Sequence, residues 1–367
     1  MNRLLRSGLR LLAVAALLSQ GAPAAAQTRY LAVPLGTLEG PADMVFAADL
    51  NNAARVAGSV RTLRGHRAFL WDPERGMADL GSMPGPRPAA GAEALSDAGL
   101  VVGGGRAGNP FAPERAFVWG HSEGMGGLDI PGARGSRARA VNASGRVAGS
   151  AWVDSRERVF LWSADEGPQL PEALAGAQPR GLADDGTVVG RLRLQGRPVP
   201  FVWHPERGLR TPALEPGTRG VANALAEDGN VVGRLSDRSG TRAFVWRPPA
   251  PLTILDGLPQ GGGYAEALGV NAGGVVVGRA VTGAGMTAFV WNAAGGMRAL
   301  EDLIAGGAPP ELHLFAAPAV NDAGQIVAYG RRPGERAVRS YLLTPVTPTA
   351  RRPASRRPQV AVSPPGA

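Results

Sequence analysis

Three carboxylates stand outside the regular pattern of this sequence and could carry acid–base chemistry. They are Asp154, Glu266 and Glu311. Two carboxylates separated by roughly 5–10 Å form the active site of a glycosidase, so these residues are the candidates for a secreted carbohydrate-active enzyme, a glycoside hydrolase or a lyase. No Gly-x-Ser-x-Gly segment lies between a predicted strand and helix, and no phosphate-binding glycine loop precedes a helix. We therefore predict a non-catalytic protein and keep the enzyme as the alternative.

Metal and cofactor chemistry finds little support. The four histidines, His66, His121, His204 and His313, include no pair at the i, i+4 spacing of a metal site, and we interpret them as solvent-facing turn residues. Cysteine is absent, which excludes thiolate nucleophiles and cysteine-bound metals. Short acidic turns such as "ADDG" (183–186) supply too few oxygens for calcium. We predict no metal site and no cofactor.

The elements that position these side chains belong to an internal repeat. One phrase, a small residue or Asn followed by a turn and then by Val-Val-Gly or a close variant, occurs seven times. Its copies span residues 49–58, 94–103, 140–149, 181–190, 224–233, 269–278 and 319–328. In six copies a glycine occupies the turn position that requires a positive φ, whereas the first copy has Ala54, where we expect a strained or altered turn.

A second phrase of the type Ala-Phe-Val-Trp follows each first phrase. Its tryptophans are Trp71, Trp119, Trp162, Trp203, Trp246 and Trp291. A seventh, divergent copy without tryptophan, "SYLL", spans residues 340–343. A large aromatic residue that recurs once per repeat is typical of packing between neighbouring sheets. We therefore assign these tryptophans to the core and not to a sugar-binding surface.

Each repeat contains four short segments with the pattern of antiparallel strands. Four strands recurring every ~40–50 residues are the signature of a propeller blade. The sequence thus predicts an all-β, seven-bladed β-propeller built of four-stranded antiparallel blades. Because the chain begins with a lone strand at 30–38 and ends after the third strand of a repeat, the N-terminal strand should close the last blade beside residues 339–344.

The combination of phrases resembles the HAF-repeat proteins of bacteria, which are secreted. They are named for a His-Ala-Phe tripeptide set between an Asn-x-x-Gly-x-Val-Val-Gly phrase and an Asp-Leu-Gly phrase. This chain departs from the family at the His position, which is occupied by Arg67, Arg115, Arg158, Arg242 and Arg339, and by Val199 and Thr287 in the other two repeats. The resemblance implies an extracellular repeat protein and no defined activity.

The alternation of strands assigns each loop to one of two ends of a blade. The loops between second and third strands, together with the links between repeats, hold 24 arginines and nine acids. The turns at the opposite end hold five arginines and twelve acids. We predict that the arginine-rich end binds a ligand through the following residues: Arg67, Arg115, Arg134, Arg137, Arg139, Arg158, Arg180, Arg219, Arg242 and Arg339. For the five at the family's His position, stacking on aromatic rings and local ion pairs are the competing interpretation.

An anion is the ligand that such a surface favours. Candidates are an acidic polysaccharide, the phosphates of lipopolysaccharide, or a partner protein. The net charge of +9 is no argument for nucleic acid, because all 39 basic residues are arginine and seven of them lie in the two terminal segments, which leaves the body at +2.

The termini indicate the destination of the chain. Residues 1–26 combine arginines, a short apolar run and a small-residue cleavage site, which predicts a signal peptide cleaved after Ala26. The propeller follows over 27–345, and residues 346–367 form a tail rich in Pro and Arg that we expect to be disordered. The apolar run is too short to span a bilayer. The sequence therefore predicts a secreted or periplasmic binding or scaffolding protein.

Overall fold

The repeats fold into consecutive antiparallel strands. The computed structural model describes residues 28–83, 89–108, 111–259, 261–305 and 312–346, and within these ranges it contains 28 strands and two 3-10 helices. The 3-10 helices are η1 (Glu172–Leu174) and η2 (Glu301–Leu303). The predicted signal peptide and nearly all of the predicted tail lie outside the described residues.

We number the repeat units one to seven in chain order. Units one and two contain β2 (Met44–Leu50), β3 (Val56–Thr62), β4 (Gly65–Asp72) and β5 (Gly76–Asp79), then β6 (Ala89–Leu95), β7 (Val101–Arg106), β8 (Arg115–Gly120) and β9 (Gly124–Gly127). Units three and four contain β10 (Ala133–Val141), β11 (Val147–Val153), β12 (Arg156–Ser163) and β13 (Gly167–Gln169), then β14 (Ala177–Leu182), β15 (Val188–Leu194), β16 (Arg197–His204) and β17 (Gly208–Arg210).

The remaining units follow the same order. Units five and six contain β18 (Arg219–Leu225), β19 (Val231–Asp237), β20 (Gly240–Trp246) and β21 (Thr253–Ile254), then β22 (Gly261–Val270), β23 (Val276–Thr282), β24 (Gly285–Asn292) and β25 (Gly296–Ala299). Unit seven contains β26 (His313–Val320), β27 (Ile326–Arg331) and β28 (Arg339–Val346), and β1 (Arg29–Pro34) completes it.

The all-β propeller is confirmed, but the predicted number of blades is wrong. The structure has five four-stranded blades, and units five and six join into one eight-stranded sheet. The junction is a parallel pairing of β20 with β22 at Thr241 and Tyr264. The outermost strand of unit five, β21, has only two residues and leaves part of β20 uncovered. The first residues of β22, glycines 261–263, lie beside this uncovered part. The carbonyl of Gly263 packs so closely against Gly240 that no Cβ would fit there. A sequence pattern of equal repeats gives no sign of this merger.

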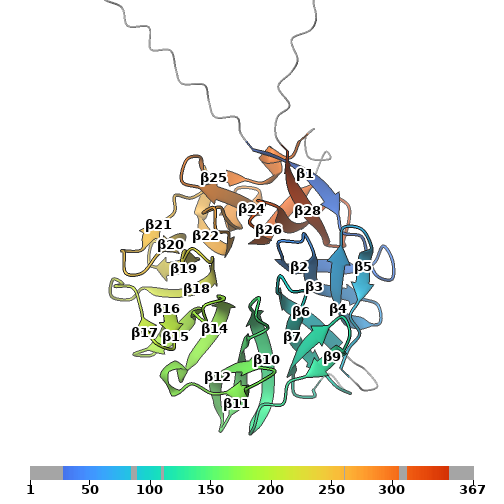
Figure 1. Ribbon diagram of the computed structural model, residues 1–367. Helices are drawn as coiled ribbons and strands as arrows, with labels where there is room; N and C mark the ends of the chain where they lie inside the picture. Colours follow the sequence, from blue (N-terminus) through green and yellow to red (C-terminus); the bar gives the residue numbers. More distant parts are fainter. Residues whose placement is uncertain (1–27, 84–88, 109–110, 260, 306–311, 347–367) are drawn as a thin grey trace, which may run out of the picture. The chain divides into compact units, whose positions relative to one another are not determined.

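The N-terminal strand closes the last sheet as predicted. β1 pairs antiparallel with β28 along its whole length, from Arg29 opposite Val346 to Pro34 opposite Tyr341. Val346, which we assigned to the tail, is therefore the last residue of a strand. The first strands of successive units contact one another around the centre of the body, and β26 contacts β2 (Figure 1). Two cavities lie at this centre, each lined by residues in or directly after the seven first strands, and we call the space they form the central channel. The strands are β2, β6, β10, β14, β18, β22 and β26.

The two repeated phrases build the core together. In units one to six the glycine of Val-Val-Gly lies directly opposite the phenylalanine of the second phrase, as Gly58 opposite Phe69 and Gly149 opposite Phe160. A Cβ on Gly149 would come within 2.4 Å of the Phe160 ring. All six phenylalanines are fully buried, which stabilises each unit by roughly 1.5–3 kcal/mol per ring. The spacing of the phrases is thus a packing requirement.

The tryptophans of the repeat are core residues, as predicted. Trp71, Trp203 and Trp246 are buried, and the other three are half-buried and pack against core clusters. The expected strain at Ala54 is present as well. Ala54 has a φ of 60°, and its N–H still bonds to the Asn51 carbonyl as in the glycine-containing turns. The first unit therefore keeps the turn with an unfavourable residue.

Candidate functional site

The strand order gives the body two different ends. The arginine-rich end consists of the hairpins between the second and third strands of each unit and the links between units. The acidic end consists of the turns between first and second strands and between third and fourth strands. The central channel runs between these ends, because the first strand of every unit lines it.

The middle of the channel contains charged side chains. A cavity of about 240 Å³ is lined by Asp49, Glu93, Arg139, Arg180 and Asn223 among other residues. Glu93 bonds to Arg139 at 3.2 Å, so those two charges compensate each other. Asp49 accepts the backbone N–H groups of Leu50 and Leu95, and burial raises its pKa to about 6.

Arg180 is the arginine of this cavity that makes no ion pair with the described residues. Its side chain is exposed to the channel, and it takes part in no ion pair or side-chain hydrogen bond with the described residues. The protein walls around the Arg180 guanidinium, and then the positive charges of Arg139 and Arg191, lower its pKa, whereas the carboxylates of Glu93 and Glu266 raise it. A guanidinium that makes no ion pair of its own keeps its donors available for an anion that enters the channel.

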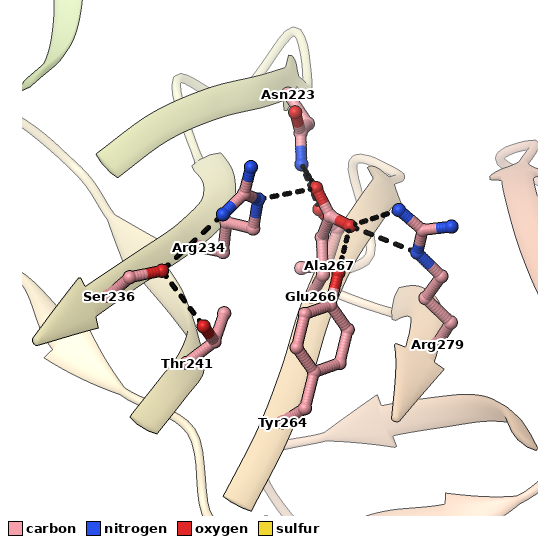
Figure 2. Close-up of polar contacts among 8 residues, drawn as sticks. All are labelled: Asn223, Arg234, Ser236, Thr241, Tyr264, Glu266, Ala267 and Arg279. Atoms are coloured by element: carbon pink, nitrogen blue, oxygen red, sulfur yellow. Dashed lines mark hydrogen bonds and ion pairs between the residues drawn. The ribbon is translucent and has the colours of Figure 1, made fainter. Parts of the chain in front are cut away.

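A buried carboxylate joins units five and six beside the channel (Figure 2). Glu266 Oε1 accepts from Arg234 Nε at 2.9 Å and from Asn223 Nδ2 at 3.1 Å. Its Oε2 accepts from the Tyr264 hydroxyl at 2.7 Å and from Arg279 Nη2 at 2.7 Å. Burial by itself raises the pKa of Glu266, but the donors and the two guanidiniums lower it by more, so the net pKa lies below its ordinary value.

This network bears on the enzyme alternative. A carboxylate held ionised between two arginines is a poor proton donor, whereas a glycosidase acid needs a raised pKa. Asp154 lies in the exposed hairpin between β11 and β12 of unit three, with a φ of 48°, and so belongs to a different sheet from Glu266. Glu311 lies outside the described residues.

Four of the five arginines at the family's His position have local partners. Arg67 lies 3.8 Å from Asp79, and Arg158 bonds to Glu172 at 2.6 Å. Arg158 Nε is buried without an acceptor among the described residues. Arg242 pairs with Asp237, and Arg339 donates to the carbonyls of Asp43 and Pro41. These contacts are the local pairs of the competing interpretation. The aromatic stacking that it also predicted is not seen for these arginines in the described part of the chain.

The other predicted arginines divide into two groups. Arg137 bonds to Glu114 at 3.0 Å and lies 3.4 Å from Glu93, so it is compensated, like Arg139. Arg115, Arg134, Arg180 and Arg219 are exposed and make no ion pair or side-chain hydrogen bond with the described part of the chain. We call these four the unpaired arginines. Arg115, Arg134 and Arg219 each stand at or next to the beginning of a strand that starts from the arginine-rich end.

Two groups at this end were not predicted from the sequence. The residue after Val-Val-Gly is arginine in three successive units, as Arg191, Arg234 and Arg279, and this regularity was visible in the repeat. The other group surrounds Trp152, the tryptophan outside the repeated phrase, whose side chain is 48% exposed. The interpretation of the histidines as turn residues is correct for His121 alone. His66 lies in β4, His204 ends β16, and His313 begins β26, where it lies 3.3 Å from Glu301.

The acidic end has a structural function. The asparagines of the repeated phrase donate to the carbonyl of the equivalent residue in the next unit: Asn51 to Ser96, Asn142 to Ala183, Asn271 to Asn321, and Asn321 to Asn51. The acids beside them accept backbone N–H groups of the preceding unit, as Asp97 does from Asn52 at 2.8 Å. Such side chains link neighbouring units by hydrogen bonds, and the carboxylate oxygens that accept them are less available to a ligand.

Among the described residues, no helix has the length and apolar character needed to cross a membrane. No protein-family model matches the chain, and no curated protein matches it.

The chain is similar to several solved structures. It resembles virginiamycin B lyase from Staphylococcus aureus, with 10% identity, coverage of 87% of this chain and 99% of that one, and a TM-score of 0.55. It resembles an oligogalacturonate lyase in complex with manganese, with 12% identity, coverage of 87% and 96%, and a TM-score of 0.55. For TolB from Acinetobacter baumannii the identity is 14%, the coverage 66% of this chain and 62% of that one, and the TM-score 0.49, so this chain spans 62% of that protein's length. At such identities the two lyases show the fold alone.

Proposed function

We propose that this chain is a secreted, non-catalytic β-propeller that binds an anionic polymer at its arginine-rich end. The observation that carries this proposal is the set of unpaired arginines, three at the arginine-rich end and Arg180 inside the channel. Paired arginines have their charge cancelled locally, whereas unpaired ones sum to a field that attracts anions. Arginine also matches the geometry of carboxylate and phosphate groups.

The ligand classes are those the sequence favours: an acidic polysaccharide or the phosphates of lipopolysaccharide, with a partner protein as an alternative. The membership of the chain among HAF-repeat proteins is part of the proposal, as is export with cleavage after Ala26. Mass spectrometry of the exported protein tests the cleavage, because a mature chain that begins at Gln27 is the expected product.

The experiment compares two matched double variants of the purified protein in binding to polyphosphate and alginate. Arg134→Gln/Arg219→Gln removes two unpaired arginines, and Arg75→Gln/Arg247→Gln removes two exposed arginines from the opposite end. We expect the first variant to bind about tenfold more weakly and the second to bind as wild type. Binding should also weaken as salt rises from about 50 to 500 mM, because the Debye length, the distance over which charges act, shortens to a few ångströms. Equal losses in both variants, or affinity that is independent of salt, would overturn the proposal.

The absence of catalysis is tested separately. The purified protein is incubated with a panel of acidic and neutral polysaccharides, and new reducing ends and unsaturated uronates are measured. No product above the buffer control is expected. Hydrolysis or β-elimination of any polymer by the purified protein would establish the enzyme alternative instead.

A further inference from the structure

The tryptophan outside the repeat lies in a groove between units three and four. Trp152 is in β11, directly opposite Glu157 of β12. Residues directly opposite each other on paired strands share one face of the sheet. Glu157 accepts a hydrogen bond from Gln178 of unit four, so this face of the sheet is turned toward unit four. Trp152 therefore presents its exposed indole to the groove.

The groove has the size of a small-molecule site and a mixed polar lining. Its volume is about 550 Å³, within the ~300–1,000 Å³ that such sites occupy. Unit three contributes Trp152, Arg156 and Arg158, and unit four contributes Arg191 and Arg193. The groove opens at the arginine-rich end, since these residues lie beside the hairpins between second and third strands.

Two of its arginines are available for an anion. Arg158 is neutralised by Glu172, and Arg191 donates to the Gln178 amide oxygen. Arg156 is exposed and makes no ion pair with the described residues, and Arg193 donates only to the carbonyl of Gly196. The groove thus combines a flat aromatic face with two cations that lack a carboxylate partner.

We propose that this groove binds a uronic acid residue of an acidic polysaccharide, a refinement that rests on the function proposed above. The apolar C–H face of the pyranose ring packs on the Trp152 indole, and the sugar carboxylate pairs with Arg156 or Arg193. The carboxylates of Glu157 and Glu172 accept hydrogen bonds from sugar hydroxyls. A nucleic acid could also stack on an indole, and a single-stranded oligonucleotide is therefore one of the competitors in the test.

The test measures binding of an alginate tetrasaccharide to the purified protein by isothermal titration calorimetry. Trp152→Ala should weaken binding at least tenfold, and Trp152→Phe should stay within about threefold of wild type because it keeps an aromatic face. Arg156→Gln/Arg193→Gln should also lose at least tenfold. The control Leu209→Ala removes another exposed apolar side chain, 40% exposed, from the outermost strand of unit four and should bind as wild type.

Three further probes separate the possible results. Maltotetraose, which lacks the carboxylate, should bind at least tenfold more weakly than the uronate, and equal binding would overturn the role of the arginines. A single-stranded oligonucleotide that binds more tightly than the uronate and is lost in Trp152→Ala would overturn the choice of ligand. Polyphosphate binding should be unchanged in Trp152→Ala. If that variant binds the uronate as wild type while polyphosphate binding still depends on the unpaired arginines, the groove proposal fails and the proposed function stands.

Discussion

Replacing Glu266 by glutamine tests whether one buried carboxylate holds units five and six together. The carboxylate accepts from Asn223 and Arg234 of unit five and from Tyr264 and Arg279 of unit six. Glutamine keeps the shape, but it carries no charge and presents an NH₂ donor on one side. Toward unit five that donor meets the donors of Arg234 and Asn223, and toward unit six it meets the guanidinium of Arg279, although the Tyr264 hydroxyl can turn to accept from it. The substitution therefore removes both ion pairs and the hydrogen bond to the guanidinium on one side.

The expected loss of stability follows from the burial of the three charged groups. Removing one partner of a buried ion pair costs roughly 3–5 kcal/mol, and a hydrogen bond to a charged group contributes roughly 1.5–3 kcal/mol. Glu266 is only 6% exposed, but both guanidiniums are 36% exposed, so solvent screens part of the interaction. We expect the free energy of unfolding to fall by about 2–4 kcal/mol near pH 7.

Urea denaturation followed by tryptophan fluorescence measures this loss, with the exposed Glu206→Gln as the control that should change stability by less than about 0.5 kcal/mol. A pH series adds a second readout. The folded-state pKa of Glu266 lies below its ordinary value of 4.5, so the stabilisation is fully present above that value and is lost as the pH falls through the folded-state pKa. The difference between wild type and Glu266→Gln should shrink in acid. A difference below about 0.5 kcal/mol near pH 7, or one that stays constant down to about pH 3, would refute the reasoning.

Other parts of the molecule give further predictions. Burial raises the pKa of Asp49 to about 6, so between about pH 4 and 6 the folded state holds a proton on Asp49 that the unfolded state has lost. The free energy of unfolding should therefore fall by up to about 3 kcal/mol as pH rises from about 4 to 7. In a pH series of urea titrations, Asp49→Asn should remove this dependence. Ala54→Gly relieves the positive φ and should raise the unfolding free energy by up to about 1 kcal/mol, whereas Ala53→Gly in the same turn should lower it, and the reverse order would contradict the strain at Ala54. Phe160→Ala should destabilise the chain by about 3–5 kcal/mol in the same assay, and a loss below about 1 kcal/mol would show that the opposed Gly–Phe pairs are not the core. Deleting residues 1–34 removes β1 and exposes the edge of β28, so amide hydrogen exchange should accelerate more in β28 and in its paired strand β27 than in the other units.

The sequence alone predicted most of the local architecture. Turn glycines, alternating apolar residues and the spacing of the two phrases are short-range features, and they predicted the strands, the buried tryptophans, the strained turn at Ala54 and the pairing of β1 with β28. The closing strand could be predicted because an incomplete last repeat leaves an unpaired strand edge, and a lone first strand is available to fill it. The distribution of arginine between the two ends also followed from strand alternation, since successive connections alternate between the ends.

Only the tertiary structure decided which of these arginines are unpaired. Arg67 and Arg115 occupy the same position in the repeat, yet Arg67 has Asp79 within reach and Arg115 makes no such contact with the described residues. Partners such as Glu93 for Arg139 or Asn223 for Glu266 come from other units and are brought close by packing around the channel. The merger of units five and six and the groove beside Trp152 arise in the same way. Charge compensation and cavities depend on distances between units, and a repeating pattern specifies each unit but not the differences between neighbours.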